Sequence, residues 1–170
     1  MARFLLVLAA LLTFTLHLVA QPAQAKQKVL LYHRTAGFRH DSIPDALDAL
    51  ETLGSRYGFD TQRSEDEDDF LDQDWINQFD ALVFVSVSGK ALSNRGAANM
   101  RTYMENGGGY FGIHEACDAL YQEPWYGRLV GAYFNYHPYL QHFSLDVQSH
   151  DHPSTNFLND TWDVYDEVYT

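Results

Sequence analysis

Short apolar runs alternate with helix-like patterns between residues 28 and 113. An uninterrupted apolar run predicts a strand buried on both faces, and apolar residues three and four positions apart predict a helix. Helices are expected to begin at Ser42 and Ser93, and strands are expected at residues 28–33, 59–63, 81–87 and 110–113. Strands that alternate with helices favour a mainly parallel sheet covered on both faces, which is a three-layer α/β fold.

The ends of the two helices carry recognisable signals. Ser42 is a candidate N-cap with Pro44 in the first turn, and Gly54 or Gly58 is expected to end this helix. Ser93 is expected to cap the second helix in the same way. Both helices therefore have defined starts between apolar runs.

The chain beyond residue 113 is less regular. Residues 116–139 are rich in Tyr, Trp, Gly and His, and they predict an irregular lobe with one short helix at 125–130. Two further strands are expected at 143–147 and 161–169. Because no repeat or linker divides the chain, we expect one domain over residues 26–170, which is about the usual size of one domain.

The first 25 residues differ from the rest. Arg3 precedes an apolar stretch at residues 4–20, and the small-x-small triplet at 23–25 follows it. This order is typical of a secretory signal peptide with its cleavage site, and an uncleaved membrane anchor is the alternative. We therefore expect a secreted or periplasmic protein that has no contact with the membrane after cleavage.

Charge and cysteine content narrow the choice of partners. The chain has a formal net charge of −12 and would be repelled by phosphate backbones and anionic lipid, so nucleic acid is not an expected partner. Its single cysteine, Cys117, cannot form an internal disulfide, so packing must supply the stability. These numbers do not indicate the oligomeric state.

Residues 64–74 form an acidic segment. Clustered carboxylates can bind calcium, but here they lack the fixed ligand spacing and turn glycine of an EF-hand loop. We therefore interpret this segment as a solvated loop or helix edge.

A histidine stands at the end of the last predicted strand of the sheet. The glycine-rich stretch 107–114 ends on His114 and resembles a nucleophile elbow, in which a sharp turn projects one side chain from a strand end. The loops after Tyr32, at 86–90 and from His114 all leave carboxyl ends of strands, where parallel sheets bind ligands. We expect these loops to converge.

Several blocks of the sequence together resemble the trehalose-utilisation (ThuA-like) family. The resemblance covers nearly the whole chain after residue 25, in order. It lies in residues 28–29, 34–44, 107–116, 125–132, 137–138, 151–154 and 166–167. It implies a flavodoxin-like fold of the class I glutamine amidotransferase-like type, and a link to sugar metabolism with a small carbohydrate as ligand.

The resemblance also argues against glutaminase chemistry. In the amidotransferase relatives a Gly-x-Cys turn presents the catalytic thiol, whereas this chain has Gly112-Ile113-His114. An imidazole transfers protons or binds metals but is a poor acyl carrier. Cys117 lies three residues further on and is interpreted as a small buried side chain.

The candidate site residues lie in loops and in blocks that match the family. The expected catalytic residues are His114, Glu115, His40 and Glu167. The expected substrate-binding residues are Arg39, Asp41, Trp125, Tyr126, His137 and Asp166. The cluster could be an acid/base site or a metal site of His40, His114, His137 and a carboxylate. Because no short ligand spacing is present, no metal or cofactor is expected.

Three functions remain open at this point. The chain could be an enzyme, a hydrolase or lyase, that processes a disaccharide, glycoside or keto-sugar with His114 as acid/base. It could be a non-catalytic carbohydrate-binding or accessory module, or a metal-dependent hydrolase. Family members usually continue past residues 166–167, so we expect a fragment whose sheet is incomplete, or a partner chain that supplies the rest.

Overall fold

The computed structural model describes residues 25–170, so the predicted signal peptide lies outside the described residues. Four parallel strands form the main sheet in the order β2-β1-β3-β4. They are β1 (Lys28–Tyr32), β2 (Asp60–Ser64), β3 (Ala81–Val85) and β4 (Gly109–Ile113). The prediction of a mainly parallel sheet is confirmed, and the strand order agrees with the start of the flavodoxin-like order.

Alternating residues of the central strands pack on opposite faces of the sheet. On one face, Leu30 and Phe84 belong to the larger core, and on the other face Leu31 and Val85 belong to a smaller one. This period of two is a property of the extended backbone, and both sets are apolar because both faces are covered. Phe111 of β4 faces the same side as Val83 and is exposed, so this covering stops short of β4.

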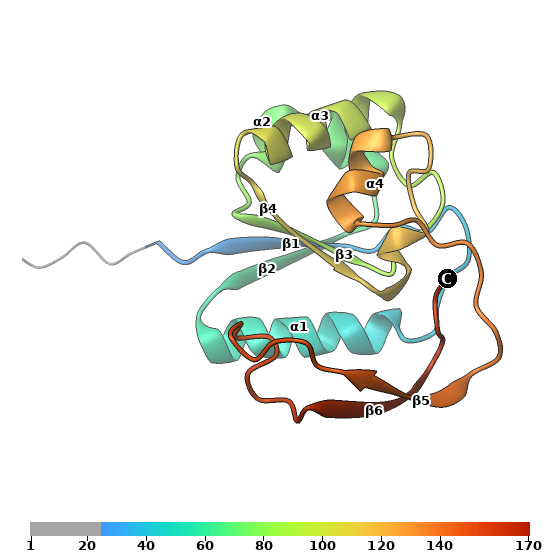
Figure 1. Ribbon diagram of the computed structural model, residues 1–170. Helices are drawn as coiled ribbons and strands as arrows, with labels where there is room; N and C mark the ends of the chain where they lie inside the picture. Colours follow the sequence, from blue (N-terminus) through green and yellow to red (C-terminus); the bar gives the residue numbers. More distant parts are fainter. Residues whose placement is uncertain (1–24) are drawn as a thin grey trace, which may run out of the picture.

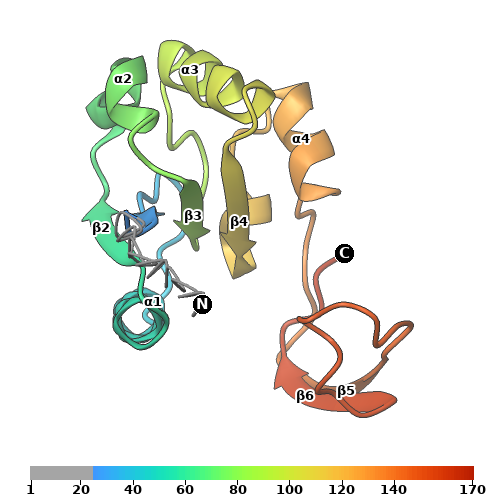
Figure 2. The same ribbon diagram turned by 90° about the vertical axis from the view of Figure 1, so that its left-hand side faces the viewer.

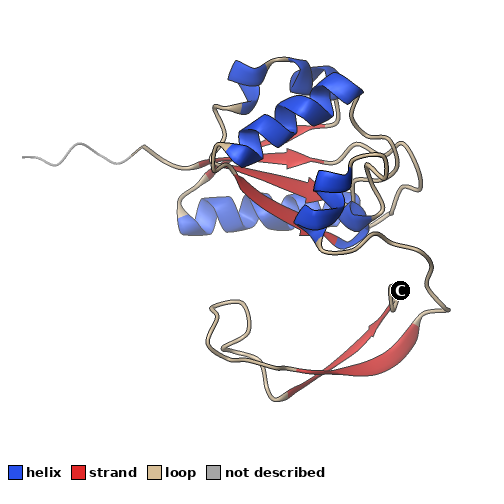
Figure 3. Cartoon of the chain, turned by 45° about the horizontal axis from the view of Figure 1, so that its top comes forward, coloured by secondary structure: helices blue, strands red, loops and turns tan. Residues whose placement is uncertain are grey.

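Helices cover the two faces as expected (Figure 1). The helix α1 (Ile43–Tyr57) lies on one face, and α2 (Gln73–Ile76), α3 (Asn94–Glu105) and α4 (Pro124–Val130) lie on the other. Figure 3 shows the same three layers by secondary structure. Within residues 25–170, no helix is both long and apolar enough to cross a membrane.

The helix ends differ in one detail from the prediction. Ser93 caps α3, since its hydroxyl accepts a hydrogen bond from the backbone N–H of Gly96. Ser42 precedes α1 but has helical backbone angles, and its side chain makes no capping hydrogen bond. Gly58 ends α1 in the left-handed conformation, which glycine adopts without steric cost.

The acidic segment is a surface connection, as expected. It forms a 3-10 helix η1 (Glu67–Leu71) followed by α2. Asp66 and Asp72 accept hydrogen bonds from the backbone N–H groups of the first turns. Phe70 anchors the segment in the core. These aspartates therefore act as helix caps.

The last two strands form a separate two-stranded ribbon, here called the arm. It consists of β5 (Gln141–Asp146) paired antiparallel with β6 (Thr161–Asp166). Figure 2 shows the arm set apart from the main sheet, beyond β4. Only the opposed pair Phe143 and Val164 is half-buried within its strands. The arm therefore has no buried core of its own.

The loops at the carboxyl ends of the sheet are joined by backbone pairing. Ser88 bridges Thr35 in the loop after β1, and its carbonyl accepts a hydrogen bond of 2.8 Å from the N–H of Ala36. The adjacent Gly89 bridges Ala119 and donates a hydrogen bond of 2.8 Å to the carbonyl of Asp118. The three loops converge as the sequence predicts.

Gly89 should be intolerant of any side chain. Its φ is +66°, and a Cβ there would lie 2.8 Å from the backbone carbon of Ala36. Gly58 has φ +84° but open space around it. We expect Gly58→Ala to lower the free energy of unfolding by about 1 kcal/mol through backbone strain alone. Gly89→Ala should lower it by at least about twice as much, as measured by urea denaturation. An equal loss of unfolding free energy in the two variants would contradict the close approach of Gly89 to the backbone of Ala36.

Candidate functional site

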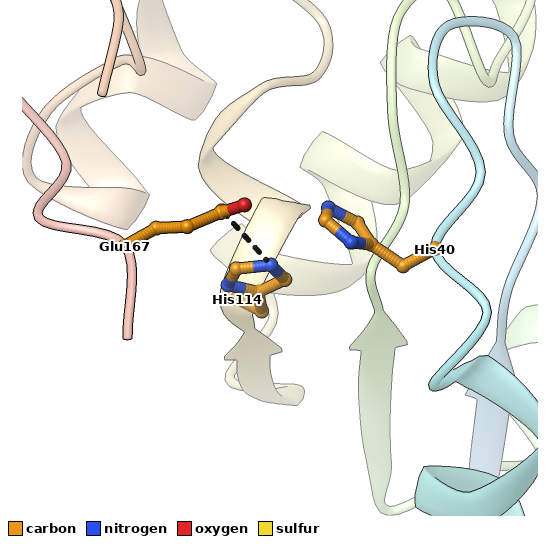
Figure 4. A group of neighbouring side chains, drawn as sticks. All are labelled: His40, His114 and Glu167. Atoms are coloured by element: carbon orange, nitrogen blue, oxygen red, sulfur yellow. Dashed lines mark ion pairs between the residues drawn. The ribbon is translucent and has the colours of Figure 1, made fainter. Parts of the chain in front are cut away.

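Three segments bring side chains together beyond the carboxyl ends of the sheet strands (Figure 4). His40 lies in the loop between β1 and α1, and His114 follows β4 directly. Glu167 follows β6 and approaches from the arm. Figure 4 shows these three side chains pointing toward one another. Parallel sheets usually place their ligand sites at this edge.

The backbone turns sharply at His114. Ile113 is extended with φ −113°, whereas His114 has φ +51°, in the left-handed region that few non-glycine residues adopt. The short 3-10 helix η2 (His114–Cys117) begins at this turn. The turn lifts the imidazole out of the strand, and its side chain is 27% exposed.

The imidazole of His114 has polar neighbours on one side. Its Nε2 lies 3.5 Å from Oε2 of Glu167 and 3.2 Å from the hydroxyl of Tyr169. The ring of His40 packs edge-on at 4.3 Å between centroids. Burial lowers the pKa of His114, and the neighbouring His40 lowers it further. The imidazole is therefore held in its neutral form at neutral pH.

Glu167 is held between two histidines. Its Oε1 lies 3.5 Å from Nε2 of His137, while its Oε2 faces His114. Two backbone hydrogen bonds anchor the chain segment that carries Glu167. The N–H of Asn135 donates to the carbonyl of Thr170 at 2.9 Å, and the N–H of Thr170 donates to the carbonyl of Tyr136 at 3.0 Å. This short pairing fixes the carboxylate over the end of β4.

Glu115 is a buried carboxylate behind the two histidines. It is only 4% exposed, and its Oε2 lies 3.8 Å from Nε2 of His40 without a hydrogen-bond partner. Burial raises the pKa of Glu115 from its ordinary value of 4.5 to about 7, and the nearby Asp118 contributes in the same direction. A group with this pKa exchanges its proton near neutral pH.

The structure thus brings together the four residues expected to be catalytic, namely His114, Glu115, His40 and Glu167, and adds the expected binding residue His137. Two other expected binding residues lie next to members of this group in sequence and are exposed. Asp166 accepts a hydrogen bond from the N–H of Glu167, and Asp41 precedes α1.

Arg39 and Trp125 lie in other environments. The guanidinium of Arg39 turns toward Glu65, 3.5 Å away, and toward the carbonyl of His33. The ring of Trp125 packs against the larger core, and its Nε1 donates to Glu123 at 2.9 Å. Neither side chain contacts the cluster around His114.

The expectation that Tyr126 contacts a sugar is wrong for this fold. Tyr126 is fully buried, and its hydroxyl donates to the carbonyl of Ala116 at 2.7 Å. It also pairs with the hydroxyl of Tyr110 at 2.8 Å. Its ring is therefore part of the core that supports η2.

Tyr169 belongs to the site although sequence reasoning missed it. Its ring stacks on His137 and also contacts His114, with centroid distances of 5.8 and 5.1 Å. Burial raises the pKa of Tyr169, and the charge of Glu167 raises it further, so its hydroxyl stays protonated. In an extended segment, residues two apart point the same way, and this spacing from Glu167 was the available signal.

Cys117 is unsuited to act as a nucleophile. It is half-buried, and its Sγ lies 3.6 Å from the carbonyl of His114. Burial raises the pKa of the Cys117 thiol, which keeps it protonated and unreactive.

The cluster has two chemical capacities. An imidazole beside a carboxylate can transfer a proton. Two imidazoles and a carboxylate can also hold a metal ion, and one ligand atom from each of His40, His114 and Glu167 lies within 4.8 Å of the others.

Comparison with known proteins agrees with this architecture. The ThuA family, described as trehalose utilisation, matches residues 28–170. No curated protein matches the chain significantly.

Two solved structures share the fold. One is described as a ThuA-like protein from Bacteroides uniformis ATCC 8492, with a TM-score of 0.72 and 20% identity, over 89% of this chain and 64% of that one. The other is described as a ThuA-like protein from Parabacteroides merdae ATCC 43184, with a TM-score of 0.69 and 18% identity, over 85% of this chain and 62% of that one. The chain thus spans less than two thirds of either structure. Because the family matches almost all the described residues, this chain belongs to the ThuA (trehalose utilisation) family.

Proposed function

We propose that this chain is an exported protein that processes a small carbohydrate, as a hydrolase or lyase, at the cluster of His40, His114 and Glu167. The ThuA family suggests a role related to trehalose utilisation. A disaccharide, a glycoside or an oxidised keto-sugar is the proposed substrate class. The signal-peptide pattern of residues 1–25 supports a secreted or periplasmic location.

The observation that carries this proposal is the conformation of His114. A non-glycine residue with φ +51° costs about 1 kcal/mol or more relative to an ordinary conformation. Glycine would remove this cost, and glycine is already used at three nearby positions, Gly107, Gly108 and Gly109. Ser86 and Leu120 have similar positive φ angles, but only at His114 does the turn direct an ionisable side chain toward a carboxylate, that of Glu167.

The surroundings of His114 suit a small polar ligand. His114 also lines an open cavity of about 350 Å³ beside β4 and α4, and the other cluster residues do not line this cavity. The imidazoles, the carboxylates and the Tyr169 hydroxyl provide the hydrogen-bonding groups that sugar hydroxyls require.

The strain at His114 can be measured with paired substitutions. His114→Gly and His114→Ala lose the same side-chain contacts. At a positive φ, alanine keeps the steric strain, whereas glycine has none. We expect the glycine variant to have the higher free energy of unfolding, by about 1 kcal/mol. At Ile113, which is extended, the order should reverse, because glycine weakens a strand by about 0.5–1 kcal/mol relative to alanine. The same order at both positions would refute the assigned strain.

The function itself is tested by turnover of a panel of disaccharides, glycosides and 3-keto-glycosides. On a responsive substrate, His114→Ala should lower kcat/KM by about 10²–10⁴-fold, which is the usual contribution of one positioned catalytic group. His142→Ala, which changes a histidine of the arm, should leave turnover unchanged. Full activity in His114→Ala would exclude this centre. Sugar binding without turnover by the unaltered chain would instead identify a binding module.

A further inference from the structure

Two buried carboxylate oxygens in the site have no hydrogen-bond partner. They are Oε2 of Glu115 and Oε2 of Glu167. Within residues 25–170, neither carboxylate forms an ion pair with a lysine or arginine. The charged groups near them are histidines, and the hydroxyl of Tyr169 also lies close to Glu167. A buried anionic oxygen without a partner is costly, and in native proteins such an oxygen usually meets a cation or ordered water.

Three side chains are arranged around one point between them. One ligand atom from each of His40, His114 and Glu167 lies within 4.8 Å of the others, and the distance from Nε2 of His114 to Oε2 of Glu167 is 3.5 Å. Two donors on a tetrahedral zinc ion, each about 2.0–2.1 Å from it, lie about 3.3–3.4 Å apart. Each ligand atom would therefore move by less than about 1 Å to bind an ion, and side-chain rotation provides such a shift.

The groups around these three side chains would orient them as ligands. His137 contacts the other oxygen of Glu167 at 3.5 Å, which leaves Oε2 directed at His114. The carboxyl group of Glu115 lies 3.8 Å from Nε2 of His40. Metal-binding histidines and carboxylates are commonly held by outer contacts of this kind.

We propose that His40, His114 and Glu167 bind one divalent transition-metal ion, with Zn²⁺ as the best fit. Two imidazoles and one carboxylate form a common protein ligand set for catalytic zinc, which leaves at least one position open for water or substrate. This inference rests on the proposed function and specifies it: His114 acts as a metal ligand in place of the proton carrier expected from the sequence. The ion would supply Lewis acidity toward a sugar oxygen or a bound water.

The hydroxyl of Tyr169 competes for the same nitrogen. It lies 3.2 Å from Nε2 of His114, so a bound ion replaces this contact. Removal of the hydroxyl should therefore leave the ligands intact and favour the ion.

The test measures Zn²⁺ binding directly. The whole chain is purified without a histidine tag, stripped with a chelator and titrated with Zn²⁺ by calorimetry, and the metal content is measured after dialysis. We expect one Zn²⁺ per chain, and weaker binding by more than about 100-fold in His40→Ala and Glu167→Gln, since even outer contacts contribute about 10–100-fold. Mg²⁺ should not compete, because it prefers oxygen ligands.

Matched controls separate ligand loss from misfolding. His150 also lies beside a carboxylate, that of Asp160 at 3.2 Å, but it is outside the cluster. The variant His150→Ala should therefore bind Zn²⁺ like the unaltered chain. Tyr169→Phe should bind Zn²⁺ equally or more tightly. Circular dichroism should show the same fold for every variant. The melting temperature should rise with Zn²⁺ only in the variants that keep all three ligands.

The outcomes distinguish this inference from the proposed function. No stoichiometric binding by the unaltered chain, or binding that survives both ligand substitutions, would overturn the metal site. If the stripped chain still processes a sugar through His114, the function stands and the metal site fails. Stoichiometric binding that depends on His40 and Glu167 supports the metal site even if no sugar is processed.

Discussion

Backbone pairing between loops at the carboxyl ends of the sheet holds the site in place. Parallel strands send all their outgoing connections to one edge, and the connection after β3 lies between the other two. Ser88 and Gly89 use consecutive peptide groups to bind the loop after β1 on one side and the segment after η2 on the other. The backbone of Ala36 lies so close to Gly89 that a Cβ at residue 89 would be only 2.8 Å from it. His40 and His114 meet because their loops share this centre.

Much of the fold could be predicted from the sequence, because it follows from local pattern. The apolar runs at β1 and β3 need cover on both faces, and the helices between them supply it. The turn at His114 was also visible, since glycines precede it and a strand leads into it. The capping role of Ser42 was not confirmed, because a serine before a helix caps only if its backbone is extended.

The candidate site was less predictable, because its contacts join distant segments. His40, His114 and Glu167 show no ligand spacing in the sequence, and only the fold brings them within reach of one another. Arg39 adjoins His40 in sequence, yet its guanidinium pairs with Glu65, which is not part of the cluster. Tyr126 has an aromatic ring that could stack on a sugar, but the ring is fully buried in the core. Local sequence shows which residues have suitable chemistry, and tertiary packing decides which of them meet.

The segment that follows the arm contributes Glu167 and Tyr169 to a site whose histidines His40 and His114 belong to the sheet domain. Backbone hydrogen bonds of Thr170 with Asn135 and Tyr136, and the contacts of Glu167 and Tyr169 with His114, hold this segment in place. A ligand that contacts both Glu167 and His114 would therefore join the segment after the arm to the end of β4.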